Sequence, residues 1–162
     1  MRLCLLNNFD ICLVRASLAD AKKIWNMQKE AFAELFEKYQ DFETSPAVEP
    51  LEKTIFRLKQ PETYFYMIQL DKQTVGAVRV VDSGNNNRKR ISPIFILPKF
   101  RNMGIAQKAI ILAEKIHGSK NWELATIMQK KRNCYLYGKM GYRTTGETKI
   151  INDKLTLVFY QK

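Results

Sequence analysis

Two apolar segments joined by a short polar connection constrain the fold more than any other feature of the sequence. Thr63–Leu70 and Thr74–Val81 are rich in β-branched and aromatic residues, and only Asp71-Lys72-Gln73 separates them. A connection this short joins strands that run in opposite directions. The sequence therefore predicts an antiparallel hairpin here, followed by a third strand over Arg90–Leu97 that ends at Pro98.

The rest of the chain alternates between strand and helix patterns. Ile24, Met27, Ala31 and Leu35 recur at a helical period after the candidate N-cap Ser17. A length of 162 residues suits one hydrophobic core, so we expect residues 1–162 to form a single domain. The expected helices are Ser17 to Phe36, Leu51–Leu58, Ile105–His117 and Asn133–Met140, and the further expected strands are Ile11–Val14, Trp122–Ile127, Tyr142–Thr145 and Lys154–Gln161.

The formal net charge of +11 is the one strong deviation in the composition. Such a charge is compatible with nucleic acid, an acidic membrane surface or a polyanionic small molecule as a partner. The basic residues are dispersed, and we interpret the local clusters Arg88-Lys89-Arg90 and Lys130-Lys131-Arg132 as solvated surface. The sequence contains no RNP-like run and no basic helix with interleaved aromatic residues, so nucleic acid is disfavoured.

The cysteines and the histidine do not indicate a disulfide-stabilised or metal-binding protein. Cys4, Cys12 and Cys134 are odd in number and include no CxxC pair. A chain of this size folds without disulfides, so the sequence predicts reduced thiols and a cytoplasmic protein. The single histidine, His117, has no nearby Cys or His partner, and no metal is expected. Its place near the end of an expected helix favours a role as a positive charge at the negative end of the helix dipole.

The N-terminal stretch is too polar for a membrane-spanning segment. No apolar run approaches the roughly 18 residues that crossing a bilayer requires. Met1–Val14 is interrupted by Asn7, Asn8 and Asp10. We therefore expect neither a signal peptide nor a membrane span.

The segment Ile94–Ala113 combines an apolar strand, a turn with a proline and a helix that begins at a glycine. N–H groups in the first turn of a helix have no partner within the helix, and together with the positive end of the helix dipole they bind phosphate. Gly104 lets a ligand approach this backbone, and Lys99 and Arg101 add positive charge. Neither the GxGxxG pattern of dinucleotide folds nor the P-loop pattern is present, so those two kinds of phosphate site are disfavoured.

Two motifs, in this order, resemble the GNAT acetyltransferase superfamily. The run from Ile94 to Ala106, IFILPKFRNMGIA, is similar to the coenzyme A signature of that family, in which a strand and a Pro-x-aromatic turn precede R-x-x-G-x-[GA]. The run from Asn133 to Tyr142, NCYLYGKMGY, is similar to its N-x-x-L-Y-x-K-x-G-[FY] segment. The resemblance implies an α/β fold with a mixed, largely antiparallel central sheet flanked by helices. It also implies an enzyme that transfers the acetyl group of acetyl-CoA to a primary amine.

The resemblance assigns roles to individual residues. An amine would attack the thioester directly, without a cysteine nucleophile, while Tyr137 protonates the departing thiolate and an N–H near Ile96 holds the oxyanion. Asn133 would contact the cofactor arm one helical turn before Tyr137. The implied cofactor contacts are the backbone of Phe95 and Ile96 with the pantetheine arm, and the N–H groups of Arg101, Asn102, Met103, Gly104, Ile105 and Ala106 with the pyrophosphate.

Some positions depart from the family pattern. Asn102 and Ala106 stand where glycines are frequent. Many family members carry a glutamate on the strand before the signature, whereas this strand offers only Ser92, which leaves the general base open. Glu30 and Glu34 on the first helix could serve as a base through water, although an exposed helix face is the favoured interpretation.

The sequence does not identify the acceptor amine, which could belong to a small molecule or to a protein. The net charge disfavours a strongly cationic acceptor unless Asp41, Glu43 and Glu49 gather at the mouth of the site. Two alternatives stay open: a non-catalytic acyl-CoA sensor, which needs Arg101–Ala106 but not Tyr137, and a basic nucleic-acid-binding protein. We expect a monomer or a homodimer without a membrane partner.

Overall fold

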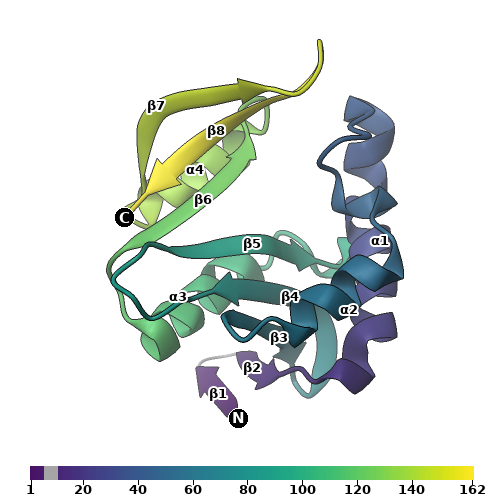
Figure 1. Cartoon of the computed structure of the whole chain (residues 1–162), viewed down its shortest axis with the longest axis vertical. Helices are drawn as coiled ribbons and strands as arrows, with labels where there is room; N and C mark the ends of the chain where they lie inside the picture. Colours follow the sequence, from purple (N-terminus) through teal and green to yellow (C-terminus); the bar gives the residue numbers. More distant parts are fainter. Residues whose placement is uncertain (6–10) are drawn as a thin grey trace.

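The computed structural model describes residues 1–5 and 11–162, and its strands form one mixed sheet (Figure 1). The strand order is β1-β2-β3-β4-β5-β6-β8-β7, and every neighbouring pair is antiparallel except β5 and β6. The strands are β1 Arg2–Leu5, β2 Ile11–Arg15, β3 Thr63–Leu70, β4 Gln73–Val81, β5 Lys89–Ile96, β6 Trp122–Ile127, β7 Arg143–Ile150 and β8 Thr156–Gln161. The helices are α1 Ala21–Tyr39, α2 Leu51–Lys59, α3 Ile105–His117 and α4 Lys131–Lys139. The expected α/β fold with a mixed, largely antiparallel sheet is confirmed.

The central hairpin turns on two residues. Leu70 of β3 lies opposite Gln73 of β4, so Gln73, which was expected in the connection, is the first residue of β4. Asp71 and Lys72 have φ values of 47° and 70°. Left-handed conformations at both central positions are typical of the type I′ turn, whose twist matches that of the strands it joins. The predicted antiparallel hairpin is confirmed.

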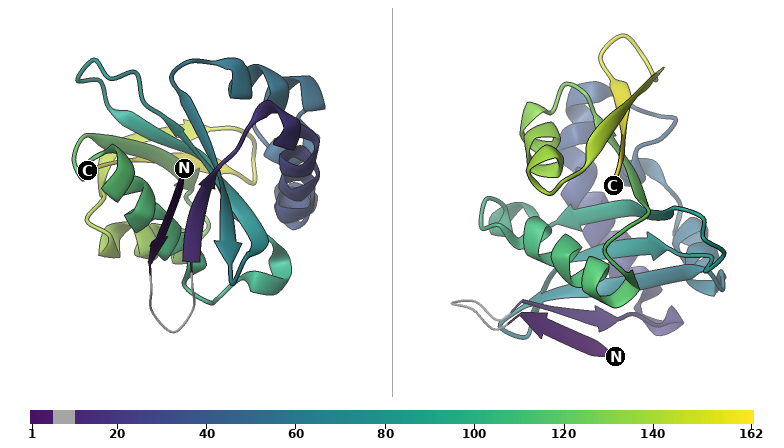
Figure 2. Two further views of the ribbon diagram at one scale, coloured as in Figure 1. Left: turned by 90° about the horizontal axis from the view of Figure 1, so that it is seen from below. Right: turned by 90° about the vertical axis from the view of Figure 1, so that its left-hand side faces the viewer.

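Helices cover both faces of the sheet. α1 and α2 lie on one face and α3 on the other (Figures 1 and 2). Alternate residues of β3 contribute to two separate core clusters: Phe65 belongs with Ile24 of α1, whereas Tyr66 belongs with Ala109 of α3. Because the central strands are covered on both faces, they are largely apolar and show no regular alternation with polar residues.

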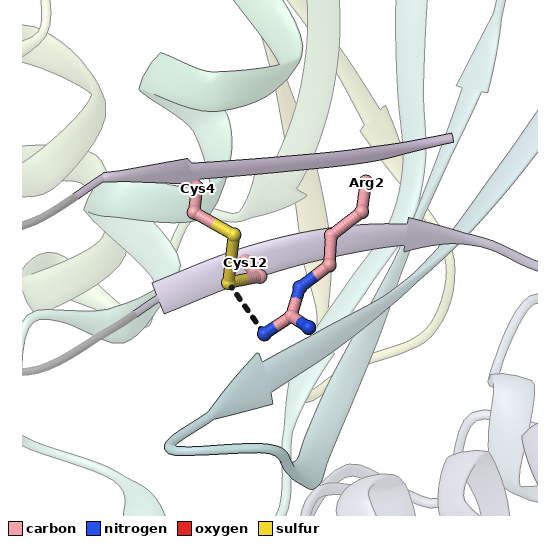
Figure 3. The surroundings of a disulfide bond; sticks show 3 residues. All are labelled: Arg2, Cys4 and Cys12. Carbon is pink, nitrogen blue, oxygen red and sulfur yellow. Dashed lines mark hydrogen bonds between the residues drawn. A yellow bond between two sulfur atoms is a disulfide. The ribbon is translucent and has the colours of Figure 1, made fainter.

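The N-terminal strand β1 has no counterpart among the expected elements, because its four residues are too few to show a period. It places Cys4 directly opposite Cys12 of β2, with Cα atoms 4.0 Å apart, and the two form a disulfide (Figure 3). The guanidinium of Arg2 lies 3.4 Å from the Cys12 sulfur. The expectation of reduced thiols is therefore wrong for this pair, whereas Cys134 is free.

Asn7, Asn8 and Asp10, which interrupt the N-terminal apolar stretch, lie outside the described residues. Within residues 1–5 and 11–162, no helix is long and apolar enough to cross a membrane. No group of three or more Cys, His, Asp or Glu residues in this part of the chain could hold a metal ion.

His117 lies in a polar cluster within the core. Its Nε2 is 2.9 Å from the Tyr66 hydroxyl, and its Nδ1 is 2.9 Å from the Asp82 carboxylate. Because an ionised carboxylate only accepts, Nδ1 carries the hydrogen and Nε2 accepts from Tyr66. Burial lowers the pKa of His117 below its ordinary value, against the opposing effect of Asp82. The ring is therefore neutral near pH 7 and is not the positive dipole partner that its position in the sequence suggests.

The buried histidine makes the stability of the fold depend on pH. Since its pKa is lower in the folded than in the unfolded chain, the unfolded state binds more protons as the pH falls through about 6.5. We expect the free energy of unfolding to fall between about pH 7.5 and about pH 5.5, and His117→Gln to reduce that slope. Urea denaturation of both proteins across this range measures the slopes. Equal slopes would contradict a neutral, buried His117.

The disulfide closes a loop between residues eight apart in sequence. A loop of this length corresponds to about 2–3 kcal/mol of stabilisation through the unfolded state. We expect Cys4→Ser to lower the free energy of unfolding by about that amount, and Cys134→Ser, the control at the free thiol, to have less effect. Alkylation of the denatured wild-type protein without reductant should label Cys134 alone. Labelling of all three cysteines would rule out the disulfide.

Candidate active site

The site lies where the parallel strands β5 and β6 separate. They pair only at Lys89 opposite Trp122 and Arg90 opposite Glu123. Beyond these residues, β5 continues along β4 to Ile96, whereas β6 continues along β8. Figure 1 shows the two strands diverging, with the β7–β8 hairpin and α4 on the far side of the gap. A wedge-shaped opening therefore interrupts an otherwise continuous sheet.

The backbone of β5 faces this gap at Ile96. The Leu97 N–H donates to the Val75 carbonyl at 2.8 Å, and the Phe95 carbonyl also faces β4, where it would lie 2.2 Å from a Cβ on Gly76. Backbone groups alternate in direction along an antiparallel strand, so those of Ile96 point away from β4. This is the direction that the expected oxyanion contact requires. Phe95 lines the gap, but its carbonyl is turned toward β4 and is not available to a ligand on the other side.

Two cavities meet in the gap. One, of about 430 Å³, lies against the turn before α3 and is called the loop cavity below; the other, of about 510 Å³, lies against β7 and β8 and is called the hairpin cavity. The residues common to both cavities come from α1, β5 and α4 with its N-cap; they are Phe32, Leu35, Ile94, Lys130, Asn133 and Tyr137. The predicted pair Asn133 and Tyr137 thus stands at the junction.

The turn that begins α3 forms one wall of the loop cavity. Asn102 and Gly104 have φ values of 66° and 71°, in the left-handed region. Asn tolerates this region better than other side chains, which explains how it stands where glycine is frequent in the family. Gly104 is the N-cap of α3 and brings no side chain to cap the first N–H groups. The cavity is lined here by Arg101, Asn102, Gly104, Ile105 and Ala106, whereas Met103 does not line it.

The Arg101 side chain is engaged within the protein. Its guanidinium donates to the Ile96 carbonyl at 3.3 Å and to the Ala31 carbonyl, and it lies 3.2 Å from the Glu34 carboxylate. The guanidinium of Arg101, which we expected to be free to attract phosphate beside the turn, therefore connects α1 to the end of β5. Glu34 pairs with Arg101 at the surface, and Glu30 is exposed, so neither lines the gap as a base would.

Other basic residues supply the charge of the loop cavity. Lys130, Arg132 and Lys139, at the two ends of α4, line it. The interpretation of the Lys130-Lys131-Arg132 cluster as solvated surface holds for Lys131 and Arg132, which are exposed, although Arg132 lines the cavity; it is wrong for Lys130, which is half-buried. Burial, followed by the nearby Arg101, lowers the pKa of Lys130. Lys130 is the N-cap of α4 and lies three residues before Asn133 in sequence.

Tyr137 is the most buried polar group at the junction, with 7% of its surface exposed. Its ring packs against Tyr142 and Tyr160, each with centroids 6.1 Å away. Burial, with a smaller effect of Cys134, raises the pKa of Tyr137 to about 12, and no hydrogen bond from the described residues contributes to the shift. Asn133 donates to the Thr126 hydroxyl at 3.4 Å. The hydroxyl of Tyr137 is thus protonated at neutral pH.

Three carboxylates line the hairpin cavity: Asp41, Glu123 and Glu147. Asp41 is occupied, because it accepts from the N–H groups of Glu43 and Thr44 and from the Thr44 hydroxyl. Of the acids expected at the mouth, Glu43 pairs instead with Lys149, and Glu49 pairs with Arg57 and Lys53 away from both cavities. Glu123 and Glu147 were not anticipated, because the gathering of β6 and β7 around the gap is not visible in sequence.

Residues 22–142 match the model of the acetyltransferase (GNAT) family. The chain belongs to this family. It is accordingly an acetyl-CoA-dependent N-acetyltransferase, and the resemblance seen in its two motifs is confirmed. No curated protein sequence matches the chain.

Several solved acetyltransferases share the fold of this GNAT protein. Spermidine N-acetyltransferase from Vibrio cholerae, in complex with CoA and spermine, has a TM-score of 0.73 at 15% identity, over 93% of each chain. The microcin C7 self-immunity acetyltransferase, in complex with acetyl-CoA and AMP, has a TM-score of 0.70 at 17% identity, over 96% of this chain and 93% of that one. An acetyltransferase from Salmonella typhimurium that modifies the N-terminal serine of ribosomal protein L7/L12 has a TM-score of 0.71 at 11% identity, over 93% and 92%.

The left-handed turn offers a test of the glycine that begins α3. A Cβ at Gly104 would meet no atom within 4 Å, so conformation rather than crowding requires the glycine. We expect Gly104→Ala to cost about 1–2 kcal/mol of stability and to weaken acetyl-CoA binding. The matched control is Gly138→Ala in α4, where a Cβ also meets nothing and the helical conformation suits alanine; it should stabilise by about 0.5–1 kcal/mol. Chemical denaturation and calorimetry measure the two effects, and equal behaviour of the variants would refute the argument.

Proposed function

We propose that this GNAT protein transfers the acetyl group of acetyl-CoA to a primary amine by direct attack, with Tyr137 as the general acid, within a single domain of residues 1–162. The observation that carries the proposal is the position of Tyr137. Tyr137 lines both the cavity beside the turn that begins α3 and a second cavity of similar size, and its hydroxyl is protonated at neutral pH. One cavity suits the donor and the other the acceptor, and the reacting atoms would meet between them.

The donor would enter through the loop cavity. The N–H groups from Arg101 to Ala106 would hold the pyrophosphate at the start of α3, where the helix dipole and the absence of a capping side chain favour an anion. Lys130, Arg132 and Lys139 would add attraction for the phosphates. The pantetheine arm would follow β5 in place of the missing strand, donating an amide N–H to the Ile96 carbonyl and passing Phe95 and Asn133.

The chemistry then uses few protein groups. The neutral amine attacks the thioester carbonyl, and the C–N bond forms while the carbonyl oxygen becomes an oxyanion. The C–S bond then breaks as the carbonyl re-forms, and the nitrogen releases its extra proton to water. The N–H of Ile96 faces the gap and would hold the oxyanion. Tyr137 would give its proton to the departing sulfur. Its pKa of about 12 exceeds that of an ordinary thiol, but an anionic sulfur in the same buried gap is also disfavoured, so transfer is not steeply uphill.

The test of the general acid is Tyr137→Phe, which keeps the ring packing and removes the hydroxyl. We expect kcat to fall about a hundredfold with acetyl-CoA saturating, while the affinity for acetyl-CoA changes little. Tyr39→Phe, at a buried tyrosine that lines neither cavity, is the matched control. Release of free thiol measures turnover. Unchanged kcat in Tyr137→Phe would exclude the assigned role.

A calorimetric titration with acetyl-CoA tests whether the protein binds the donor, which must precede the transfer. Binding followed by thiol release with at least one amine supports it. A protein that binds acetyl-CoA but releases no thiol with any amine of a broad panel would be an acyl-CoA sensor. A protein that does not bind acetyl-CoA would fit neither the enzyme nor the sensor.

A further inference from the structure

The hairpin cavity has mostly apolar walls. Glu123, Ala125 and Ile127 of β6 lie opposite Gln161, Phe159 and Leu157 of β8, so these residues share one face of the sheet. Across the gap, the cavity is closed by side chains from α1 and the loop that follows it. The apolar residues that line it include Phe32, Leu35, Pro46, Leu155, Leu157 and Phe159. A cavity of about 510 Å³ with such walls suits a small organic molecule.

The charged groups of the hairpin cavity are few and nearly balanced. The Asp41 carboxylate already accepts hydrogen bonds from Glu43 and Thr44 of its own loop. Glu123 is half-buried, and Glu147 is exposed at the rim; within the described chain, neither carboxylate forms an ion pair or a hydrogen bond. Two cations, Arg90 and Lys130, line the same cavity. One half-buried carboxylate is therefore available to a ligand, while the cations oppose a ligand with several positive charges.

A second polar group in the cavity also lacks a partner. Tyr137 is more than nine-tenths buried and lines the hairpin cavity, and no group among the described residues hydrogen-bonds to its hydroxyl. The Tyr137 hydroxyl is therefore available to a polar atom of a ligand in this cavity. Glu123 and Tyr137 thus offer a ligand two polar contacts in a cavity whose walls are mostly apolar.

We propose that the acceptor is a small primary amine with one positive charge on an aromatic or branched aliphatic body, and that Glu123 binds its ammonium form. This inference rests on the proposed N-acetyltransferase function. The apolar walls would cover the body of the acceptor, and Glu123 would draw the ammonium into the cavity before it loses its proton. A polyamine would bring further charges against Arg90 and Lys130. A lysine on a folded protein would leave Phe32, Leu35 and Phe159 exposed to water.

The experiment compares acceptors at saturating acetyl-CoA. Phenethylamine and isoamylamine represent the proposed class, and spermidine and a peptide with a free N-terminal serine represent the others. We expect kcat/KM for the better of the two monoamines to exceed that for spermidine and for the peptide by at least about tenfold. Glu123→Gln should raise the KM for that amine about tenfold with kcat largely kept. Glu37→Gln, at an exposed glutamate of α1 that lines neither cavity, should leave KM unchanged.

The outcomes separate this inference from the function on which it rests. If acetyl-CoA binds and spermidine or the peptide is the preferred acceptor, the enzyme stands and the proposed acceptor class is wrong. If the monoamines are preferred but Glu123→Gln leaves their KM unchanged, Glu123 is not the ammonium site. If acetyl-CoA does not bind, the proposed function itself fails. Far-ultraviolet circular dichroism of Glu123→Gln shows whether a raised KM comes from the site or from a loss of folding.

Discussion

The parallel pairing of β5 and β6 ends after two residue pairs, and the architecture of the site follows from that ending. A strand that loses its neighbour leaves N–H and C=O groups without partners, at a cost comparable to a lost hydrogen bond for each buried group. The chain satisfies one of these groups itself, because Arg101 donates to the Ile96 carbonyl. The N–H of Ile96 is left facing the gap. A ligand that runs along β5 and offers a carbonyl would complete the sheet at this point.

The gap stays open because contacts hold its two sides apart. Arg101 ties the end of β5 to the Ala31 carbonyl of α1. At the far end of α1, the side-chain amide of Asn152 donates to the Tyr39 carbonyl at 2.9 Å, which attaches the β7–β8 hairpin to the helix. Helix α1 thus bridges the two halves of the divided sheet. Phe32 and Leu35 lie on the helix between these attachments and line both cavities.

The elements that follow from local chemistry could be predicted from the sequence, whereas those that depend on distant pairing could not. The β3–β4 hairpin and the start of α3 at Gly104 are set by short-range turn and cap preferences, and both are found. The strand β1 escaped prediction because it is stable only through its pairing with β2 and the disulfide. Asn133 and Tyr137 could be placed on one helix face from their spacing. Their place between two cavities depends on the separation of β5 from β6, which no local pattern encodes.

Lys130 is the charged residue whose place in the fold differs most from what the sequence predicts. In sequence it is part of a basic cluster, but in the fold it lines both cavities, as Tyr137 does. A positive charge in this position affects both ligands. It attracts a donor that carries phosphates and repels an acceptor that carries several positive charges. Because the group is partly buried, solvent and salt screen both effects less than they would at the surface. Under the proposed function, Lys130 would therefore contribute both to the affinity for the anionic donor and to the discrimination against polycationic acceptors, so its substitution would change both.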